Sequence, residues 1–152
     1  MLHKWLNTIQ NMDCLEGMKQ LPDKCIDLVY ADPPFNTGGK IGWYNRSYGE
    51  NANDALTPAQ YRKFCRAWFK EARRISKRLV LTPGVGNIGL YANPIWCVVI
   101  DKPSSPSFNR MGGFNCWEPL FIYDKPFGRL PRDVVRFDSQ NFIKDGREQH
   151  PC

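Results

Sequence analysis

Short apolar runs, separated by polar segments rich in glycine and proline, mark the strands expected in this chain. Four runs have the length and composition of buried strands, and they cover residues 25–31, 79–82, 96–100 and 120–123. Residues 5–10 are a candidate for a further short strand. Proline ends the first two runs, because it cannot donate a hydrogen bond to a strand ladder; the prolines concerned are Pro33, Pro34 and Pro83.

Two helices are expected between these runs. Asp13, followed three residues later by Glu16, is typical of a capping box at the start of a short helix. Thr57, Pro58 and Gln60 give the same signal for a longer helix. Its apolar stripe has helical spacing and consists of Tyr61, Phe64, Cys65, Trp68, Phe69, Ala72 and Ile75. The basic residues off this stripe form either a solvated helix face or a surface that contacts phosphates.

The alternation of strands and helices predicts an α/β fold with a mainly parallel sheet. Residues 36–56 combine glycines with aromatic side chains and are expected to form a long loop. Loops of this length are usually functional or disordered. Residues 124–152 are mostly polar and basic.

The composition fits one globular domain, since 152 residues lie within the range of about 100–200 residues per domain. A net charge of +6 makes nucleic acid the first candidate partner. No apolar run approaches the roughly 18 residues that cross a membrane, and the first residues lack the apolar core of a signal peptide. We therefore expect a cytoplasmic protein without a membrane partner, of bacterial or phage-like origin.

The six cysteines are not arranged as metal ligands, because no two of them are two to four residues apart. Only His3 and His150 could add imidazole ligands. We therefore expect no structural metal. In a chain without a signal peptide, the cysteines are expected to be reduced and mostly buried.

The strongest chemical signal is the segment Asp32-Pro33-Pro34-Phe35-Asn36, which follows the first buried run. Ligands of open α/β sheets bind beyond the carboxyl ends of the strands. A carboxylate beside two prolines makes a rigid corner rich in acceptors, and Phe35 adds a flat apolar face. Such a corner suits a planar group that bears an amine, as a nucleic-acid base does. The alternative is a turn in which Asp32 binds nearby backbone N–H groups.

Several segments together resemble the amino-group DNA methyltransferases that use S-adenosylmethionine. The matching segments, in the order of the circularly permuted group of that family, are Asp13 to Glu16, Leu21 to Asp23, Ile26 to Val29, Asp32 to Gly38, Trp117 to Pro119 followed by Lys125-Pro126, and His150-Pro151. Aspartate at the first position of the tetrapeptide resembles adenine-N6 enzymes more than cytosine-N4 enzymes. The resemblance implies a Rossmann-like methyltransferase sheet and a role in DNA methylation, as in restriction-modification.

The resemblance also implies roles for individual residues. Asp32 and the Pro33 carbonyl would accept the two N–H groups of a base amine, and Phe35 would stack on a base flipped out of the duplex. The catalytic segment is thus Asp32, Pro33, Pro34 and Phe35, and the implied cofactor contacts are Asp13, Cys14, Asp32, His150 and Pro151. From their loop character and basic residues, segments 36–56 and 127–149 are candidates for DNA contact, with Asn36, Lys40, Trp43, Tyr44 and Arg46 as the individual residues.

The family's main cofactor motif, Phe-x-Gly-x-Gly after a strand, does not occur in the sequence. In the permuted order it would follow His150-Pro151. We therefore expect the catalytic half of a methyltransferase sheet, a partial Rossmann-like sheet whose central strands are missing. Such a chain would act as a homodimer or with a complementing chain, or it would be an inactive fragment or a DNA-binding subunit that depends on a partner.

A competing interpretation comes from residues 84–89, which match the dinucleotide fingerprint G-x-G-x-x-G after a strand. That fingerprint belongs to a unit of about 30 residues with a crossover helix. The stretch before the next apolar run is too short for such a helix and contains Pro94. A dinucleotide-binding oxidoreductase is therefore the less favoured alternative.

Overall fold

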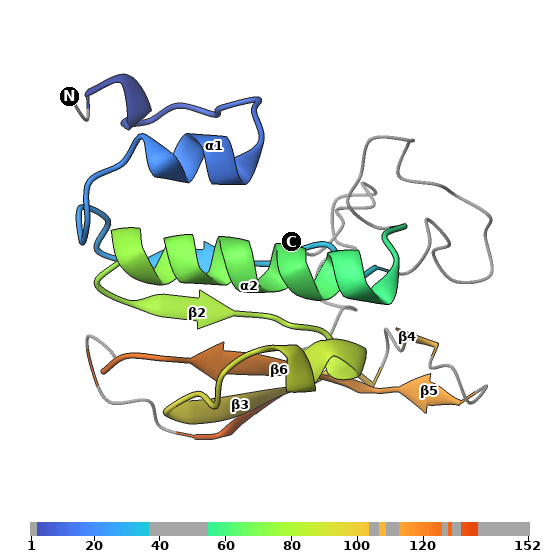
Figure 1. The fold of residues 1–152 in the computed structure, drawn as a ribbon. Coiled ribbons are helices and arrows are strands. Elements are labelled where there is room, and N and C mark those ends of the chain that lie inside the picture. Colours follow the sequence, from blue (N-terminus) through green and yellow to red (C-terminus); the bar gives the residue numbers. More distant parts are fainter. Residues whose placement is uncertain are drawn as a thin grey trace, which may run out of the picture.

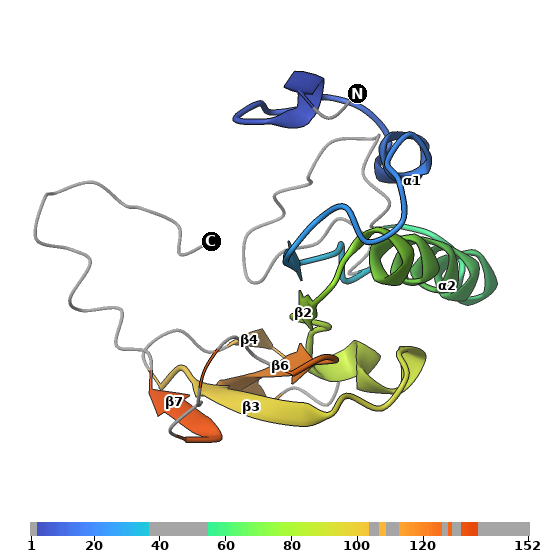
Figure 2. The same ribbon diagram turned by 90° about the vertical axis from the view of Figure 1, so that its left-hand side faces the viewer.

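A five-stranded sheet with helices on one face makes up the core of the structure, a computed structural model (Figure 1). It describes residues 3–36, 55–103, 107–108, 113–125, 128 and 132–136, with the backbone only at 107–108. The strands lie in the order β1 (Val29–Ala31), β2 (Leu79–Leu81), β6 (Trp117–Ile122), β3 (Trp96–Asp101) and β7 (Val134–Arg136). Figure 2 shows them one after another, from β1 near the helices to β7 at the far end. Strands β4 (Ser107–Phe108) and β5 (Phe114–Asn115) form a separate pair.

The α/β class is confirmed, and four of the five strands run in one direction as a mainly parallel sheet requires, but the reversal of β6 makes the sheet mixed. β1 pairs with β2 and β3 with β7 in parallel, but β6 runs antiparallel to both of its neighbours. Of the described connections, only the one from β1 to β2 carries a long helix, and a parallel pair of consecutive strands needs such a crossover. β3 and β6 are joined without a described helix and pair as an antiparallel hairpin from Trp96↔Ile122 to Asp101↔Trp117.

The crossover helix α2 (Pro58–Ile75) begins as predicted and supplies most of the core. Thr57 and Gln60 form a reciprocal capping box, and Pro58 occupies the first turn, where its missing N–H costs nothing. Its buried face packs on β2 and β6, and the core residues are Tyr61, Cys65, Trp68, Ala72, Leu79, Leu81, Tyr91, Phe121 and Tyr123. In the described segments of the chain, no helix is long and apolar enough to cross a membrane.

The short helix α1 (Cys14–Lys19) packs beside α2. Asp13 caps it as predicted, since one oxygen of its carboxylate accepts hydrogen bonds from the amides of Leu15 (2.9 Å) and Glu16 (3.2 Å). Glu16 does not complete the predicted capping box; its carboxylate instead pairs with Lys19 at 2.6 Å. The helix therefore depends on one cap and on its packing against α2.

Three other predictions need correction. Residues 5–10 form no strand: a 3₁₀ turn, η1 (His3–Trp5), is followed by irregular chain in which Ile9 is fully exposed, so no neighbour is available for pairing. The first buried run forms a strand only at its end, and Leu28 and Tyr30 stay exposed because β1 is an edge strand of the sheet. Of the five described cysteines, all free, only Cys65 is buried.

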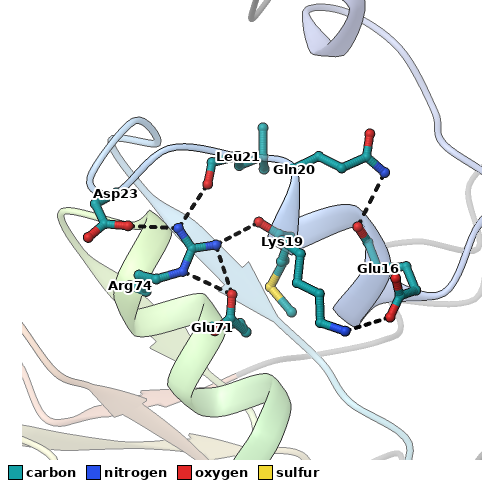
Figure 3. A network of polar contacts seen from close by, with 8 residues as sticks. Glu16, Lys19, Gln20, Leu21, Asp23, Glu71 and Arg74 are labelled. Carbon is teal, nitrogen blue, oxygen red and sulfur yellow. Dashed lines mark hydrogen bonds and ion pairs between the residues drawn. The ribbon is translucent and has the colours of Figure 1, made fainter.

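Arg74 near the end of α2 holds the two helices together (Figure 3). Its guanidinium donates to the carbonyls of Met18 and Leu21, both at 2.8 Å, where the chain leaves α1. It also pairs with Glu71 at 2.8 Å and Asp23 at 2.7 Å. A planar guanidinium satisfies these four acceptors at once, because its five N–H donors point in fixed directions.

We expect Arg74→Lys to lower the melting temperature of the protein by several degrees, because an ammonium group cannot reproduce this fork of hydrogen bonds. Arg66→Lys is the matched control, since Arg66 lies exposed on the same helix. Thermal unfolding followed by circular dichroism measures both variants. Equal melting temperatures for the two would contradict the role given to Arg74.

Candidate functional site

The candidate site lies at the edge of the sheet where β1, β2 and β3 end and β6 begins. Parallel pairing of Ala31 with Leu81 brings Asp32 and Thr82, the residues that follow β1 and β2, side by side. At the same edge, Lys102 follows β3 and Glu118 lies near the start of β6. The carboxyl ends of parallel strands are where α/β proteins bind their ligands, and the predicted catalytic segment is found there.

Asp32 is oriented by a hydrogen bond that crosses from the neighbouring strand. The Thr82 hydroxyl donates to Oδ1 of Asp32 at 2.7 Å, and Thr82 is only 4% exposed. The turn interpretation of Asp32, in which its carboxylate binds nearby backbone N–H groups, therefore does not describe its recorded contact. Asp32 itself keeps an exposed face.

The charge state of Asp32 is shaped by groups on three strands. Burial of its carboxylate raises the pKa of Asp32 above the ordinary value, and the hydrogen bond from Thr82 opposes that rise. The negative charge of Glu118 adds to the rise and the positive charge of Lys102 reduces it. These last two residues pair with each other at 2.7 Å, so their effects on the Asp32 pKa partly cancel.

The carbonyls after Asp32 are held by side chains from outside the segment. The Tyr61 hydroxyl, at the start of α2, donates to the Pro34 carbonyl at 2.7 Å. The Asn87 amide donates to the Phe35 carbonyl at 3.0 Å and to the Tyr61 hydroxyl at 3.1 Å. Within residues 3–36 and 55–103, no hydrogen bond to the Pro33 carbonyl is found. Of the carbonyls of Pro33, Pro34 and Phe35, only that of Pro33 therefore has no donor among these described residues.

The Phe35 ring rests against the chain at Gly84. This glycine has φ +73°, and a Cβ atom built on it would lie 3.1 Å from the Phe35 ring. Both the backbone angle and the close approach require glycine. The absence of a side chain at Gly84 therefore lets the Phe35 ring pack directly against the backbone there.

Asn36 closes the segment and has a structural task. It adopts φ +57°, a left-handed conformation that asparagine tolerates well. Its side chain donates to the Leu56 carbonyl at 2.9 Å and accepts from the Leu56 amide at 2.8 Å, as a neighbouring strand would. This pair joins the two ends of segment 37–55. The proposed DNA contact of Asn36 stays a prediction.

The other predicted site residues are placed only in part. The contacts of Arg74 bring the end of α1 to the end of α2, and Figure 1 shows the six-residue α1 along the end half of α2, away from the start of α2 where Tyr61 binds the Pro34 carbonyl. Neither Asp13 nor Cys14 forms a hydrogen bond to Asp32, so their cofactor contacts stay a prediction. The remaining predicted contacts, Lys40, Trp43, Tyr44, Arg46, His150 and Pro151, lie outside the described residues.

The glycine-rich stretch that suggested a dinucleotide site has a different structure. Residues Val85–Leu90 form a six-residue 3₁₀ helix, η2, rather than the crossover helix that a pyrophosphate site requires. Gly84 and Asn87 from this stretch support the 32–36 segment instead. The structural unit on which the oxidoreductase alternative depends, a strand followed by a crossover helix, is therefore not formed by residues 84–90. The side chains described here contain no group of three or more potential metal ligands.

Sequence reasoning missed the supporting residues Thr82, Tyr61 and Asn87. For Thr82 a signal was available, because it ends the apolar run expected to neighbour the first strand. No such signal was available for Tyr61 or Asn87. A tyrosine in the apolar stripe of a helix and an asparagine in a glycine-rich stretch both have many ordinary roles.

Comparisons with known proteins point to one family. A family model described as DNA methylase, covering N6 and N4 methyltransferases, matches residues 26–139. Type II methyltransferase M.HinfI of Haemophilus influenzae is 35% identical over 98 residues, which are 60% of this chain and 26% of that protein. Type II methyltransferase M.BamHI of Bacillus amyloliquefaciens is 33% identical over 123 residues, 81% of this chain and 24% of that protein. The chain thus spans about a quarter of the length of these relatives.

We expect Gly84→Ala to destabilise the fold by about 1–3 kcal/mol, because a side chain at this backbone angle is strained and its Cβ would press on Phe35. Gly86→Ala is the matched control two residues away, where a Cβ meets nothing within 4 Å. Urea unfolding gives both free energies of unfolding. An equal loss of unfolding free energy in the two variants would contradict the packing of Phe35 against Gly84.

Proposed function

This chain belongs to the DNA methylase family, and on that premise we propose that it takes part in methyl transfer from S-adenosylmethionine to the exocyclic amine of a DNA base. The observation that carries the proposal is the acceptor pair at the end of β1. Asp32 is held by Thr82 through one carboxylate oxygen, and the adjacent Pro33 carbonyl has no recorded donor among the described residues.

These two acceptors match the two N–H groups of a base amine. The amine is a poor nucleophile because its lone pair is delocalised into the ring. Hydrogen bonds from both N–H groups to Asp32 and Pro33 favour a pyramidal nitrogen, whose lone pair is then available for reaction. A raised pKa makes the Asp32 carboxylate a stronger acceptor, and fixing both acceptors in advance provides the electrostatic preorganisation that catalysis uses.

Phe35 and Pro34 complete the proposed base site. A base inside a duplex cannot reach this edge, so we propose that it is flipped out and stacks on the Phe35 ring. Adenine-N6 is the favoured target, because aspartate rather than serine begins the tetrapeptide. Segments 36–56 and 127–149 are the proposed DNA contacts, and the net charge of +6 supports a polyanionic partner.

The described residues fit one part of a cofactor site. S-adenosylmethionine, when bound, supplies an electrophilic methyl group on a sulfonium. Asp13 caps α1 through Oδ1 alone, so its second oxygen can accept a hydrogen bond from a ligand, and Cys14 is the first residue of that helix. Asp13, Cys14 and Asp32 are therefore the proposed cofactor contacts within the described chain.

One observation favours a second candidate, a subunit that works only with a second copy or a complementing chain. The proposed catalytic segment follows β1, which is one of the two edge strands of the sheet. Tyr30 on this strand is 57% exposed, and Leu28 just before it is 46% exposed. An unpaired strand edge with exposed apolar side chains is suited to accept further strands. On either reading we propose that the protein acts in the cytoplasm.

We expect Asp32→Ala to abolish methyl transfer, because it removes the charged acceptor for the amine. Transfer of tritiated methyl groups from S-adenosylmethionine to unmethylated DNA measures it. Asp27→Asn is the matched control, since Asp27 lies just before β1, at the end opposite the site, and pairs with Lys77. Transfer that survives Asp32→Ala would overturn the proposed role of Asp32.

The partner-dependent candidate predicts a different result for the chain alone. We expect isothermal titration with S-adenosylmethionine to give no heat at millimolar ligand if a second chain must complete the cofactor site. Saturable binding by the isolated chain, together with methyl transfer that depends on Asp32, would favour the self-sufficient enzyme.

A further inference from the structure

The hydrogen bond from Thr82 to Asp32 joins the ends of two neighbouring strands. The donor and acceptor oxygens are 2.7 Å apart, a normal length for a hydroxyl bound to a carboxylate. The same hydroxyl lies 3.4 Å from the Ala31 carbonyl, a distance too long to compete for its single proton. The proton of Thr82 is therefore directed at Oδ1 of Asp32.

The position of the hydroxyl is fixed by the sheet. The Thr82 amide donates to the Ala31 carbonyl at 3.0 Å, which continues the β1–β2 ladder past its last paired residues. Threonine is branched at Cβ, so its side chain has few rotamers, and this one is 4% exposed. A buried, stiff donor on a paired backbone can hold its acceptor in one orientation.

We propose that Thr82 is a positioning residue for methyl transfer, holding Oδ1 of Asp32 so that Oδ2 is presented to the substrate amine. This inference rests on the function proposed for Asp32. Thr82 touches neither substrate nor cofactor in this scheme and acts only through the carboxylate. Without the hydroxyl, the carboxylate can rotate, and either oxygen can turn away from the amine.

A purely structural role is the alternative, in which the hydrogen bond only fastens β1 to β2. The two roles differ in what the loss of the hydroxyl does to methyl transfer, since fastening alone would lower stability and leave kcat unchanged. The pKa of Asp32 reports whether the hydrogen bond acts on the carboxylate at all. The groups that act on this carboxylate are Thr82 on β2, Glu118 on β6 and Lys102 after β3. Since the Thr82 hydrogen bond stabilises the charged form, its removal must raise the pKa of Asp32, whereas the Glu118–Lys102 pair is left in place.

The test compares Thr82→Val, which keeps the shape but loses the donor, with Thr82→Ser, which keeps the donor. Carbon-13 NMR of labelled aspartate carboxyl groups in the full chain gives the pKa of Asp32. This measurement does not require the protein to be active. We expect a higher pKa in Thr82→Val and the wild-type pKa in Thr82→Ser. Ser76→Ala is the control, because it removes another buried hydroxyl, 1% exposed and at the far end of α2.

Methyl-transfer kinetics provide the second readout. We expect Thr82→Val to lower kcat about tenfold with little change in KM for DNA, and Thr82→Ser to restore kcat. Because the reaction needs the carboxylate form, activity falls as pH drops through the Asp32 pKa, and this acid limb should move to higher pH in Thr82→Val. If Thr82→Val does not fold, Thr82→Ala removes the same donor without burying a further methyl group.

An unchanged Asp32 pKa in the variant without the hydroxyl, or a Thr82→Ser variant as impaired as Thr82→Val, would overturn the proposal. These results are separable from a failure of the proposed function. Methyl transfer that does not depend on Asp32 would remove that function and with it the positioning role, even if Thr82 still shifts the Asp32 pKa. Methyl transfer that depends on Asp32 but ignores Thr82 would remove only the positioning role.

Discussion

The parallel pairing of β1 with β2 is the constraint on which the site depends. Ala31 opposite Leu81 brings the next residues of both strands, Asp32 and Thr82, within hydrogen-bonding distance. A shift of one residue along either strand would turn the side chains to opposite faces of the sheet and separate this pair. The register is in turn secured by burial, because Leu79 and Leu81 are fully buried beneath α2. Core packing thus determines the geometry of a polar pair in which Thr82 is buried and Asp32 is exposed.

The crossover helix links the site to the rest of the fold through its two ends. At its start, Tyr61 binds the Pro34 carbonyl, so the same side chain belongs both to the core and to the support of segment 32–36. Near its end, Arg74 fastens the chain that leaves α1. The 18 residues of α2 span about 27 Å at 1.5 Å per residue. The contact with α1 and the support of segment 32–36 thus lie near opposite ends of one helix.

Sequence patterns predicted the parts of the structure that depend on neighbouring residues. The cap and the apolar stripe of α2 are local, as is the break at Pro33, and the structure confirms these features. Strand direction is not local, because an apolar run reads the same in a parallel or an antiparallel pair, so the reversal of β6 was missed. The supports of the site join segments about 50 residues apart, as between Asp32 and Thr82 or Phe35 and Asn87. Such contacts follow from the register and from tertiary packing.

The use of acceptors in segment 32–36 would make the proposed base site selective for a group that bears two donors. The carbonyls of Pro34 and Phe35 are bound by protein donors, and the Asn36 amide is bound to Leu56. A carbonyl oxygen that already accepts from one protein donor keeps one lone pair for a ligand, whereas a carbonyl without a donor keeps both. Among the described residues, the acceptors with the most capacity left are Asp32 and Pro33, on consecutive residues whose backbone is stiffened by two prolines. A ligand with two N–H groups on one nitrogen can use both, whereas a hydroxyl, with a single proton, leaves one of them unmatched.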